Sequence, residues 1–283
     1  MTTSIPNDAK LAVVVSHPAH LLTCIGILLR WDPRILIVHA ASEGPGARQL
    51  ERMQDCLAQA GLNQQITSLK IDESVSFWQT IEHKFDAHLE ISHHLFEWMT
   101  SVSPTHVIGD AYEASNFHHD LTRLMLDDAV KRYRSTDREL ENLEFPLFAQ
   151  LDQPGHPVVY GTFFNDDCLS YDLTDPEIEI KRNIVEQARG DDEFIDLMAR
   201  HFPSMSKEPY RSVSPSRDYR MPPEGLTLYY DQLGQEVVKS GKYKTAINFQ
   251  EHFLPLVTAL ENGSIHDLQK DRDKGSQSRG PLH

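Results

Sequence analysis

Two histidines follow the first predicted strand of the chain. Residues 11–16 (LAVVVS) form a short apolar, β-branched run, and the segment HPAH (17–20) comes directly after it. Such a run is typical of a buried parallel strand, and open α/β sheets bind ligands at the carboxyl ends of their strands. Imidazole is a good ligand for zinc, iron, nickel and copper, and His17 and His20 could face one point. The alternative is that each histidine only satisfies a backbone hydrogen bond in a loop.

A second group of polar residues follows another predicted strand. The strand HVIG (106–109) leads into the segment GDAYEASNFHHD (109–120). Because the carboxyl ends of parallel strands meet at one rim, we expect His118 or His119 to lie near the first histidine pair. Adjacent side chains rarely point the same way, so one of these two is the expected ligand. The alternative is that both histidines open a helix and bond to its first turn.

The elements that position these residues alternate between strands and helices. This order predicts an α/β fold, a Rossmann-like open and mostly parallel sheet with helices on both faces and a C-terminal helical and irregular appendage. The expected strands are 11–16, 34–40, 66–71, 106–109, 145–151 and 157–162, with a turn at Pro154-Gly155. The expected helices are 21–31, 48–60, 75–101, 120–134, 174–200 and 248–260.

We expect one domain over residues 1–262. Its core is 9–165, and 166–262 is the appendage, in which the Pro/Ser/Arg-rich stretch 203–223 is expected to be irregular. Residues 263–283 are polar and nearly free of apolar side chains, which predicts a disordered tail.

Composition excludes several classes of partner. Lys and Arg number 27 and Asp and Glu 42 in 283 residues, a net charge of −15, which would repel nucleic acid and anionic membranes. No apolar run reaches the ~18–20 residues of a membrane span, and the start has no signal-peptide pattern. Three cysteines without a CxxC motif fit a reducing compartment, so a cytoplasmic location is expected. A small-molecule substrate is the expected partner, and a homo-oligomer stays open.

The order of these motifs resembles the PIG-L/LmbE-like metal-dependent de-N-acetylases. That family has His-Pro-Asp-Asp-Glu where this chain has HPAH (17–20), and the stretch 112–120 is similar to its Tyr-Glu-Gly-Gly-His-Pro-Asp-His-Asp motif. Further similar segments bring the resemblance to residues 11 to about 260; they are 41–44, 48–51, 60–62, 241–243 and 251–256. The resemblance implies a divalent metal, zinc with ferrous iron as the alternative, on His17, His20 and His119.

The departures from the family pattern concern the catalytic groups. A ligand Asp of the family has become His20, the general-base Asp has become Ala19, and a catalytic imidazole falls on Asn116. Three histidines with an open position are a known catalytic zinc arrangement. Glu113 is our first candidate for a replacement base, ahead of Asp110, since a carboxylate within ~3 Å of the reacting water could take its proton.

Other roles follow from the same motifs. Glu113 could instead only hold its loop, and orienting a histidine is the favoured role of Asp110. His118 is a further candidate base, and the amide of Asn116 could donate a hydrogen bond to an oxyanion. The resemblance implies that Arg48 and Tyr112 bind substrate, with a solvated helix-start arginine as the alternative for Arg48.

The sequence therefore predicts a metal-dependent hydrolase, de-N-acetylase-like, that cleaves an amide in a small polar molecule. Because position 19 has no proton acceptor, a diverged metal-assisted reaction is kept open. The alternative is a catalytically inactive binding or structural protein on the same fold. If only a base is missing, Ala19→Asp should raise de-N-acetylation of simple N-acetyl sugars.

Overall fold

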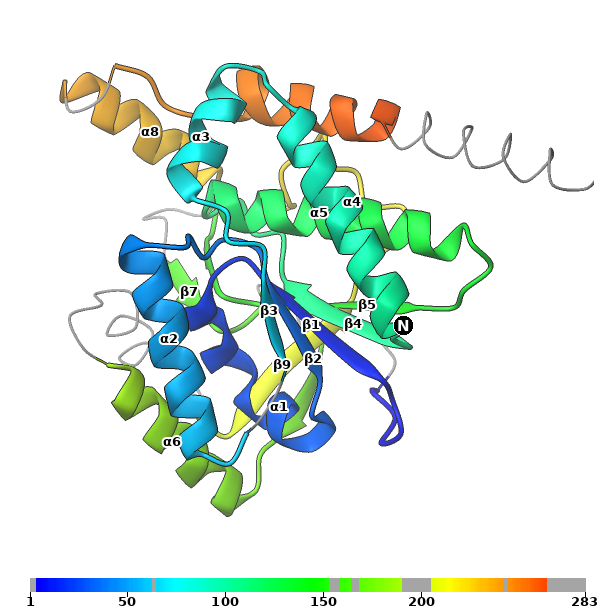
Figure 1. The fold of residues 1–283 in the computed structure, drawn as a ribbon. Helices are drawn as coiled ribbons and strands as arrows, with labels where there is room; N and C mark the ends of the chain where they lie inside the picture. The colour runs from blue at the N-terminus through cyan, green and yellow to red at the C-terminus, as the bar shows by residue number, and fades with distance from the viewer. Residues whose placement is uncertain are drawn as a thin grey trace, which may run out of the picture.

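The strands form one mixed sheet that carries the rest of the molecule. The computed structural model describes residues 4–62, 65–152, 158–163, 168–189, 205–241 and 244–263. Seven strands pair in the order β3-β2-β1-β4-β5-β9-β8, and the first five of them run parallel (Figure 1). The strands are β1 Leu11–Val15, β2 Arg34–Ile37, β3 Ile66–Ser68, β4 His106–Asp110, β5 Glu141–Phe145, β8 Leu169–Asp172 and β9 Lys207–Ser212. The predicted α/β fold with a mostly parallel sheet is confirmed.

Helices cover both faces of this sheet (Figure 1). They are η1 Pro18–Cys24, α1 Ile25–Trp31, α2 Gly44–Gln59, α3 Glu73–Ile81, α4 Asp86–Val102, α5 Phe117–Arg134, α6 Asp175–Ala188, α8 Tyr229–Lys239 and the π-helix η2 Phe249–Phe253. Side chains alternate across β1, so Val13 and Val15 pack into one core cluster and Val14 into another. The first cluster includes residues of α1, α2 and α6, and the second includes residues of α4, α5 and η2. A short separate hairpin pairs β6 Phe148–Gln150 with β7 Val158–Tyr160.

The strand order reverses at β1, which pairs with β2 on one side and β4 on the other. In open α/β sheets the crevice at such a reversal is where ligands bind. Gly109 lets β4 approach β1 closely here: a Cβ at this position would lie 2.6 Å from the backbone oxygen of Val14. Because Gly109 has no side chain, β4 can lie close to β1, and this places the next residue, Asp110, at the crevice.

The predicted helix over 75–101 is wrong in one respect, because the chain breaks it into α3 and α4. His83 lies between them with a φ of +56°, a left-handed conformation that interrupts the helix. The apolar periodicity of the segment continues across the break because both helices turn an apolar face to the second core cluster.

The expectation of an irregular stretch at 203–223 is also wrong for part of its length. Residues 207–212 form β9, which pairs antiparallel with β5 and β8 inside the main sheet. Glu208 anchors it: its carboxylate accepts hydrogen bonds from Lys181 Nζ at 2.7 Å and from the backbone nitrogens of Gly26 and Ile27, each at 2.9 Å. The C-terminal part of the chain therefore completes the sheet.

Several element boundaries differ from those expected. The strand expected at 145–151 is divided between β5, which starts at Glu141, and β6. The final helix comprises η2 followed by α-helical residues 254–263. The Pro154-Gly155 turn, the helical stretch 190–200 and the tail from 264 lie outside the described residues.

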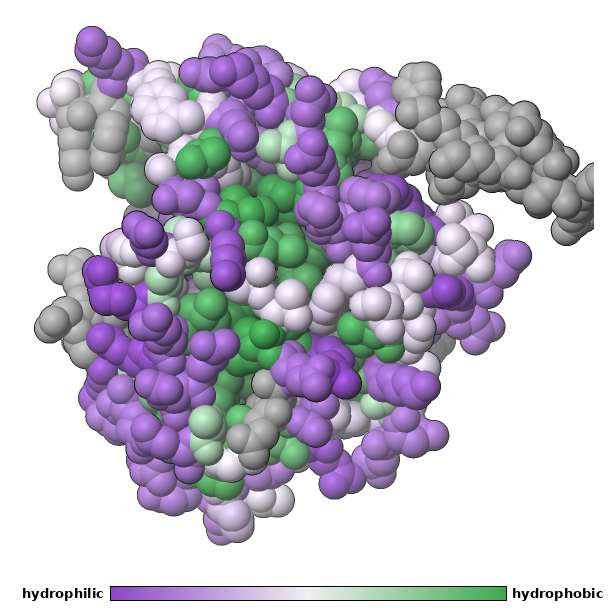
Figure 2. Space-filling model, viewed as in Figure 1, coloured by the Kyte–Doolittle hydropathy of each residue, from purple (hydrophilic) through white to green (hydrophobic). Residues whose placement is uncertain are grey.

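Figure 2 shows hydrophilic surface around most of this face, with apolar surface gathered near its middle, between α2 below and α3 and α4 above. Among the helices that the structure describes, none is both long and apolar enough to cross a membrane.

Candidate metal centre and active site

Three histidines from two segments meet in the crevice. His17 follows β1, His20 lies in η1, and His119 lies in the first turn of α5. One nitrogen of each ring lies within 4.8 Å of the corresponding nitrogens of the others. The ring centroids of His20 and His119 are 4.4 Å apart, and that of His17 is 5.0 and 5.2 Å from them. The sequence placed these three side chains at one rim, and the structure brings them together.

A buried carboxylate orients His20. Asp110 Oδ2 lies 2.9 Å from His20 Nδ1, and it accepts hydrogen bonds from the backbone nitrogen and hydroxyl of Ser16 at 2.7 and 2.5 Å. Because a carboxylate accepts, Nδ1 of His20 carries the proton and the lone pair lies on Nε2. A carboxylate behind a metal-ligating imidazole fixes its tautomer and raises its basicity. The position of Asp110 matches this orienting role.

The donor set fits a divalent transition metal. His119 Nδ1 is buried, with no hydrogen-bond partner among the described residues. Burial lowers the pKa of His20 in spite of the opposing effect of Asp110, and burial together with the other histidines lowers that of His119. Both rings are therefore neutral near pH 7 and keep lone pairs for a metal. Three imidazoles form a donor set suited to zinc, iron, nickel or copper.

Glu73 is the carboxylate that the sequence analysis missed. It is the first residue of α3, its Oε1 lies 2.9 Å from His17 Nε2, and its side chain is half exposed. Burial alone would raise the pKa of Glu73, but the hydrogen bond and charge of His17 lower it to about 2. Asp72 fixes the start of α3 by accepting a hydrogen bond from Ser74 N at 2.7 Å. The Asp72-Glu73 pair before an apolar helix was the available signal.

His39 is a second residue that the sequence analysis did not select. It follows β2, is 2% exposed, and neither ring nitrogen has a hydrogen-bond partner among the described residues. Its ring centroid lies 5.7 Å from that of His17 and 5.1 Å from that of His118. Burial and these neighbouring imidazoles hold the pKa of His39 well below its usual range. The signal was its place near the end of the strand expected at 34–40.

The histidines open onto a pocket of about 450 Å³. Its described lining includes His17, His20, His39 and His119, the acidic residues Glu43, Asp72 and Glu73, and the amides Gln49 and Asn116. Among the described lining residues there is no lysine or arginine. The pocket therefore combines a set of imidazole nitrogens with acidic residues, and it is large enough for a small organic molecule.

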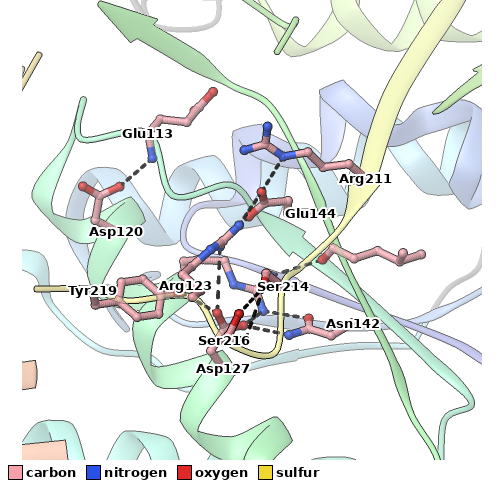
Figure 3. A network of polar contacts seen from close by, with 12 residues as sticks. Glu113, Asp120, Arg123, Asp127, Asn142, Glu144, Arg211, Ser214, Ser216 and Tyr219 are labelled. Atoms are coloured by element: carbon pink, nitrogen blue, oxygen red, sulfur yellow. Dashed lines mark hydrogen bonds and ion pairs between the residues drawn. The ribbon is translucent and has the colours of Figure 1, made fainter. Parts of the chain in front are cut away.

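Glu113 lies outside this pocket. Its two carboxylate oxygens accept hydrogen bonds from the backbone nitrogen of Leu147 at 3.2 and 3.0 Å, and one also accepts from Phe148 N at 3.1 Å. Burial raises the pKa of Glu113 well above its ordinary value. Its backbone nitrogen donates to Asp120 Oδ1 at 3.1 Å (Figure 3). These contacts match the loop-holding alternative for Glu113.

Asn116 and His118 have different positions. Asn116 lines the pocket and caps α5, with its Oδ1 accepting from His118 N at 2.8 Å. The ring of His118 turns to α3, where Nε2 lies 3.1 Å from the backbone oxygen of Glu73. Burial lowers the pKa of His118 to about 4. His118 thus contacts the backbone of Glu73, whereas the ring of His119 faces His17 and His20.

The two expected substrate-binding residues do not line the pocket. Arg48 is exposed on α2, although Pro45, Gly46 and Gln49 of the same helix do line it. Tyr112 is 4% exposed, and its hydroxyl donates to the backbone oxygen of Met221 at 3.3 Å. Its ring stacks on Phe253 with 6.1 Å between centroids.

Ala19 occupies a different environment from that expected of a base. It is fully buried and packs in the first core cluster, among apolar side chains such as Leu21 and Ile25. A carboxylate at position 19 would therefore enter a buried position of the first core cluster.

A buried charge network lies behind the α5 side of the site (Figure 3). Glu144 accepts hydrogen bonds from Arg211 Nε at 2.8 Å and from Arg217 at 2.7 and 2.6 Å. Arg123 and Asn142 both donate to Asp127 Oδ1. Burial alone would raise the pKa of Glu144, but Arg217 and then Arg211 lower it to about 2. The network ties α5, which carries His119, to β5 and β9.

Comparison with known proteins gives structural likenesses only. No protein-family model and no curated protein matches the chain. A triple mutant of a deacetylase from the teicoplanin biosynthetic pathway is 12% identical, covers 74% of this chain and 99% of its own, and has a TM-score of 0.49. The A40926 pseudoaglycone deacetylase Dbv21 is 11% identical over the same shares, with a TM-score of 0.48. The zinc-inhibited form of teicoplanin deacetylase Orf2 is 12% identical over the same shares, with a TM-score of 0.47. These values are too low to assign a function.

Proposed function

We propose that this protein is a divalent-metal-dependent hydrolase that cleaves an amide bond in a small molecule. The observation that carries the proposal is the convergence of His17, His20 and His119 in a pocket at the carboxyl edge of the sheet. Asp110 behind His20 supplies the carboxylate that metal-ligating histidines commonly have. The pattern resemblance to metal-dependent de-N-acetylases points to the same reaction class.

The metal-binding role belongs to the three imidazoles. His20 has its lone pair on Nε2, because its Nδ1 faces Asp110, and His17 would bind through Nδ1, because its Nε2 faces Glu73. A zinc or ferrous ion held by such a set supplies Lewis-acid chemistry, which polarises a carbonyl oxygen and makes water more acidic. His119 completes the set from α5.

Glu73 is the proposed acid–base group, in place of Glu113, Asp110 and His118. Its carboxylate lines the pocket and is ionised near pH 7, so it can accept a proton at an Oε atom. In the proposed reaction water adds to the amide carbon, its proton passes to Glu73, and the proton is returned to the nitrogen as the C–N bond breaks. The products are a carboxylic acid and an amine. Once protonated, the amine is attracted by the acidic residues of the pocket.

Asn116 is the proposed hydrogen-bond donor to the substrate. Its Oδ1 is engaged with His118 N, which orients the amide so that the Nδ2 group is the one free to turn to the pocket. An amide N–H placed near the carbonyl oxygen stabilises the charge that develops there. His39, which has no hydrogen-bond partner among the described residues, offers one donor and one acceptor to a polar substrate.

Metal analysis of matched variants tests this proposal. The purified protein should contain a stoichiometric divalent metal, His119→Ala should lose most of it, and His118→Ala should keep it. Release of amine from N-acyl amines should stop on chelation and return on addition of zinc or ferrous ion. A protein that binds no metal, or that loses none in His119→Ala, would contradict the proposed centre.

A further inference from the structure

We infer that an apolar groove beside the metal pocket holds the acyl chain of the substrate, so that the preferred substrate is an amide of a medium-length apolar acid rather than an acetamide. The inference rests on the proposed amide hydrolysis and names its substrate class. The groove has a volume of about 550 Å³, within the range of pockets for small organic ligands.

The groove and the metal pocket share part of their lining. Glu73, Ser74 and Asn116 line both cavities, so the proposed acid–base group and the proposed carbonyl donor stand at the border between them. A substrate whose carbonyl lies beside Asn116 can therefore extend in two directions. One leads to the histidines and the acidic residues, and the other leads into the groove.

The groove is lined mainly by apolar side chains, which come from α3, from the start of α5, from α8 and from the segment 244–247. α3 contributes Phe77 and Trp78, α5 begins with Phe117, and α8 contributes Leu233 and Val237. Trp78 is 51% exposed and Leu233 44%, which leaves large apolar surface open to water. Covering that surface with an acyl chain is favourable, whereas the acidic metal pocket suits the polar end of the same molecule.

The walls of the groove are held in place. The ring of Phe117 packs edge-on against Tyr230 at 6.1 Å and against Phe253 at 6.3 Å. Gly234 of α8 allows a close approach to the segment beyond it, since a Cβ there would lie 2.9 Å from Ala246 Cβ. These contacts fix the positions of Phe117 and of the α8 backbone in the lining of the groove.

Charge argues for a neutral acyl chain as the occupant. The described lining of the metal pocket holds three carboxylates and no cation, so a free anion at that end is disfavoured. Lys244 is the single cationic residue in the described lining of the groove. A neutral amide forms no ion pair with Lys244. The difference in affinity between two neutral amides therefore reports their apolar contact with the groove.

The direct test is binding of acetamide and octanamide to the chelator-treated protein, measured by calorimetry. Each fully buried methylene raises affinity by about fourfold, and octanamide has about six methylenes more than acetamide, so it should bind on the order of 100-fold more tightly even if each is about half buried. Val237→Trp should remove most of that preference because the indole fills the groove. Val238→Trp is the matched control, since Val238 is exposed, next on α8 and outside the lining.

A second variant keeps the test valid if Val237→Trp does not fold. Leu233→Gln places a polar amide at an exposed position of the lining and should also reduce the preference. Equal binding of the two amides by the parent protein, or equal preference in the Val237 and Val238 variants, would overturn the inference. So would a dimer that covers Trp78 and Leu233 and excludes octanamide.

Kinetics separates this inference from the proposed function. With metal restored, N-octanoyl glucosamine should be cleaved with a higher kcat/KM than N-acetyl glucosamine, and Val237→Trp should reverse the order. Equal values for the two substrates would contradict the acyl-chain groove while leaving amide hydrolysis intact. Preferential binding of octanamide without cleavage of either substrate would contradict the hydrolase while leaving the groove intact.

Discussion

Asp110 and His20 form a buried pair, with 2.9 Å between Oδ2 of the carboxylate and Nδ1 of the imidazole. The pair joins the end of β4 to η1, two segments that are 90 residues apart in sequence. Asp110 fixes the tautomer of His20 that has its lone pair on Nε2. Metal binding requires a fixed tautomer, and without the carboxylate either ring nitrogen could carry the proton. Asp110 therefore acts on the proposed centre through His20.

Replacing Asp110 with Asn should weaken metal binding by about 10- to 100-fold, because the amide cannot stabilise the ligand tautomer as a carboxylate does. Titration of the chelator-treated protein with zinc measures the affinity. Asp55→Asn, at an exposed position on α2, is the control and should bind zinc as the parent does. An unchanged zinc affinity in a folded Asp110→Asn protein would show that the carboxylate does not orient the ligand.

Replacing Glu73 with Gln should lower kcat by about 10²- to 10⁴-fold with metal content preserved, because Gln cannot accept the proton. Steady-state kinetics of amine release gives kcat, and metal analysis gives occupancy. Glu43→Gln removes another carboxylate from the pocket lining and should have a much smaller effect. If Glu113→Gln reduced kcat in this range and Glu73→Gln did not, the base would be Glu113 in spite of its backbone contacts.

The buried ion pairs of Glu144 make the free energy of unfolding depend on pH in the acidic range. Its pKa in the folded protein, about 2, is lower than the ordinary value of 4.5, so folding favours the ionised form. The corresponding stability is complete above pH ~4.5 and is lost as pH falls toward 2. Denaturant unfolding at several pH values should show this slope, and Glu144→Gln should flatten it. Breaking the pairs should cost about 3–5 kcal/mol near pH 7.

Adding a carboxylate at position 19 should destabilise the protein instead of creating a base. Ala19 is fully buried among apolar side chains, and an unpaired buried charge costs about 3–5 kcal/mol. Thermal unfolding of Ala19→Asp should show a clearly lower Tm, with no gain in cleavage of N-acetyl sugars. Ser42→Asp adds the same charge at an exposed position and should leave Tm nearly unchanged. Higher activity in a stable Ala19→Asp protein would refute this expectation.

Replacing His39 with Phe should raise thermal stability and weaken substrate binding. Two buried nitrogens without described partners carry a desolvation penalty of about 1–3 kcal/mol, which an apolar ring of similar shape relieves. We therefore expect a higher Tm together with a raised KM for a hydroxylated substrate. His93→Phe, on the exposed side of α4, is the control. A lower Tm with unchanged KM would mean that His39 is a structural residue only.

Local patterns predicted the central strands and the three histidines, because a buried strand followed by ligating residues depends on few distant contacts. The position of Glu73 could not be predicted from local patterns. It depends on the path of the chain after β3 and on the Asp72 cap of α3. Strand β9 was missed because it contains Pro209, which argues against a strand, and because its partner β5 lies more than 60 residues earlier. The burial of Ala19 likewise follows from packing across the sheet.

Every described residue of the metal pocket belongs to the first 119 positions, whereas α8 and β9 come after position 200. During synthesis the ligand-bearing half of the chain leaves the ribosome first. The residues proposed to bind the metal are therefore all synthesised before the α8 wall of the groove. In the proposed scheme, one part of the chain provides the chemistry and a later part provides the choice of acyl chain.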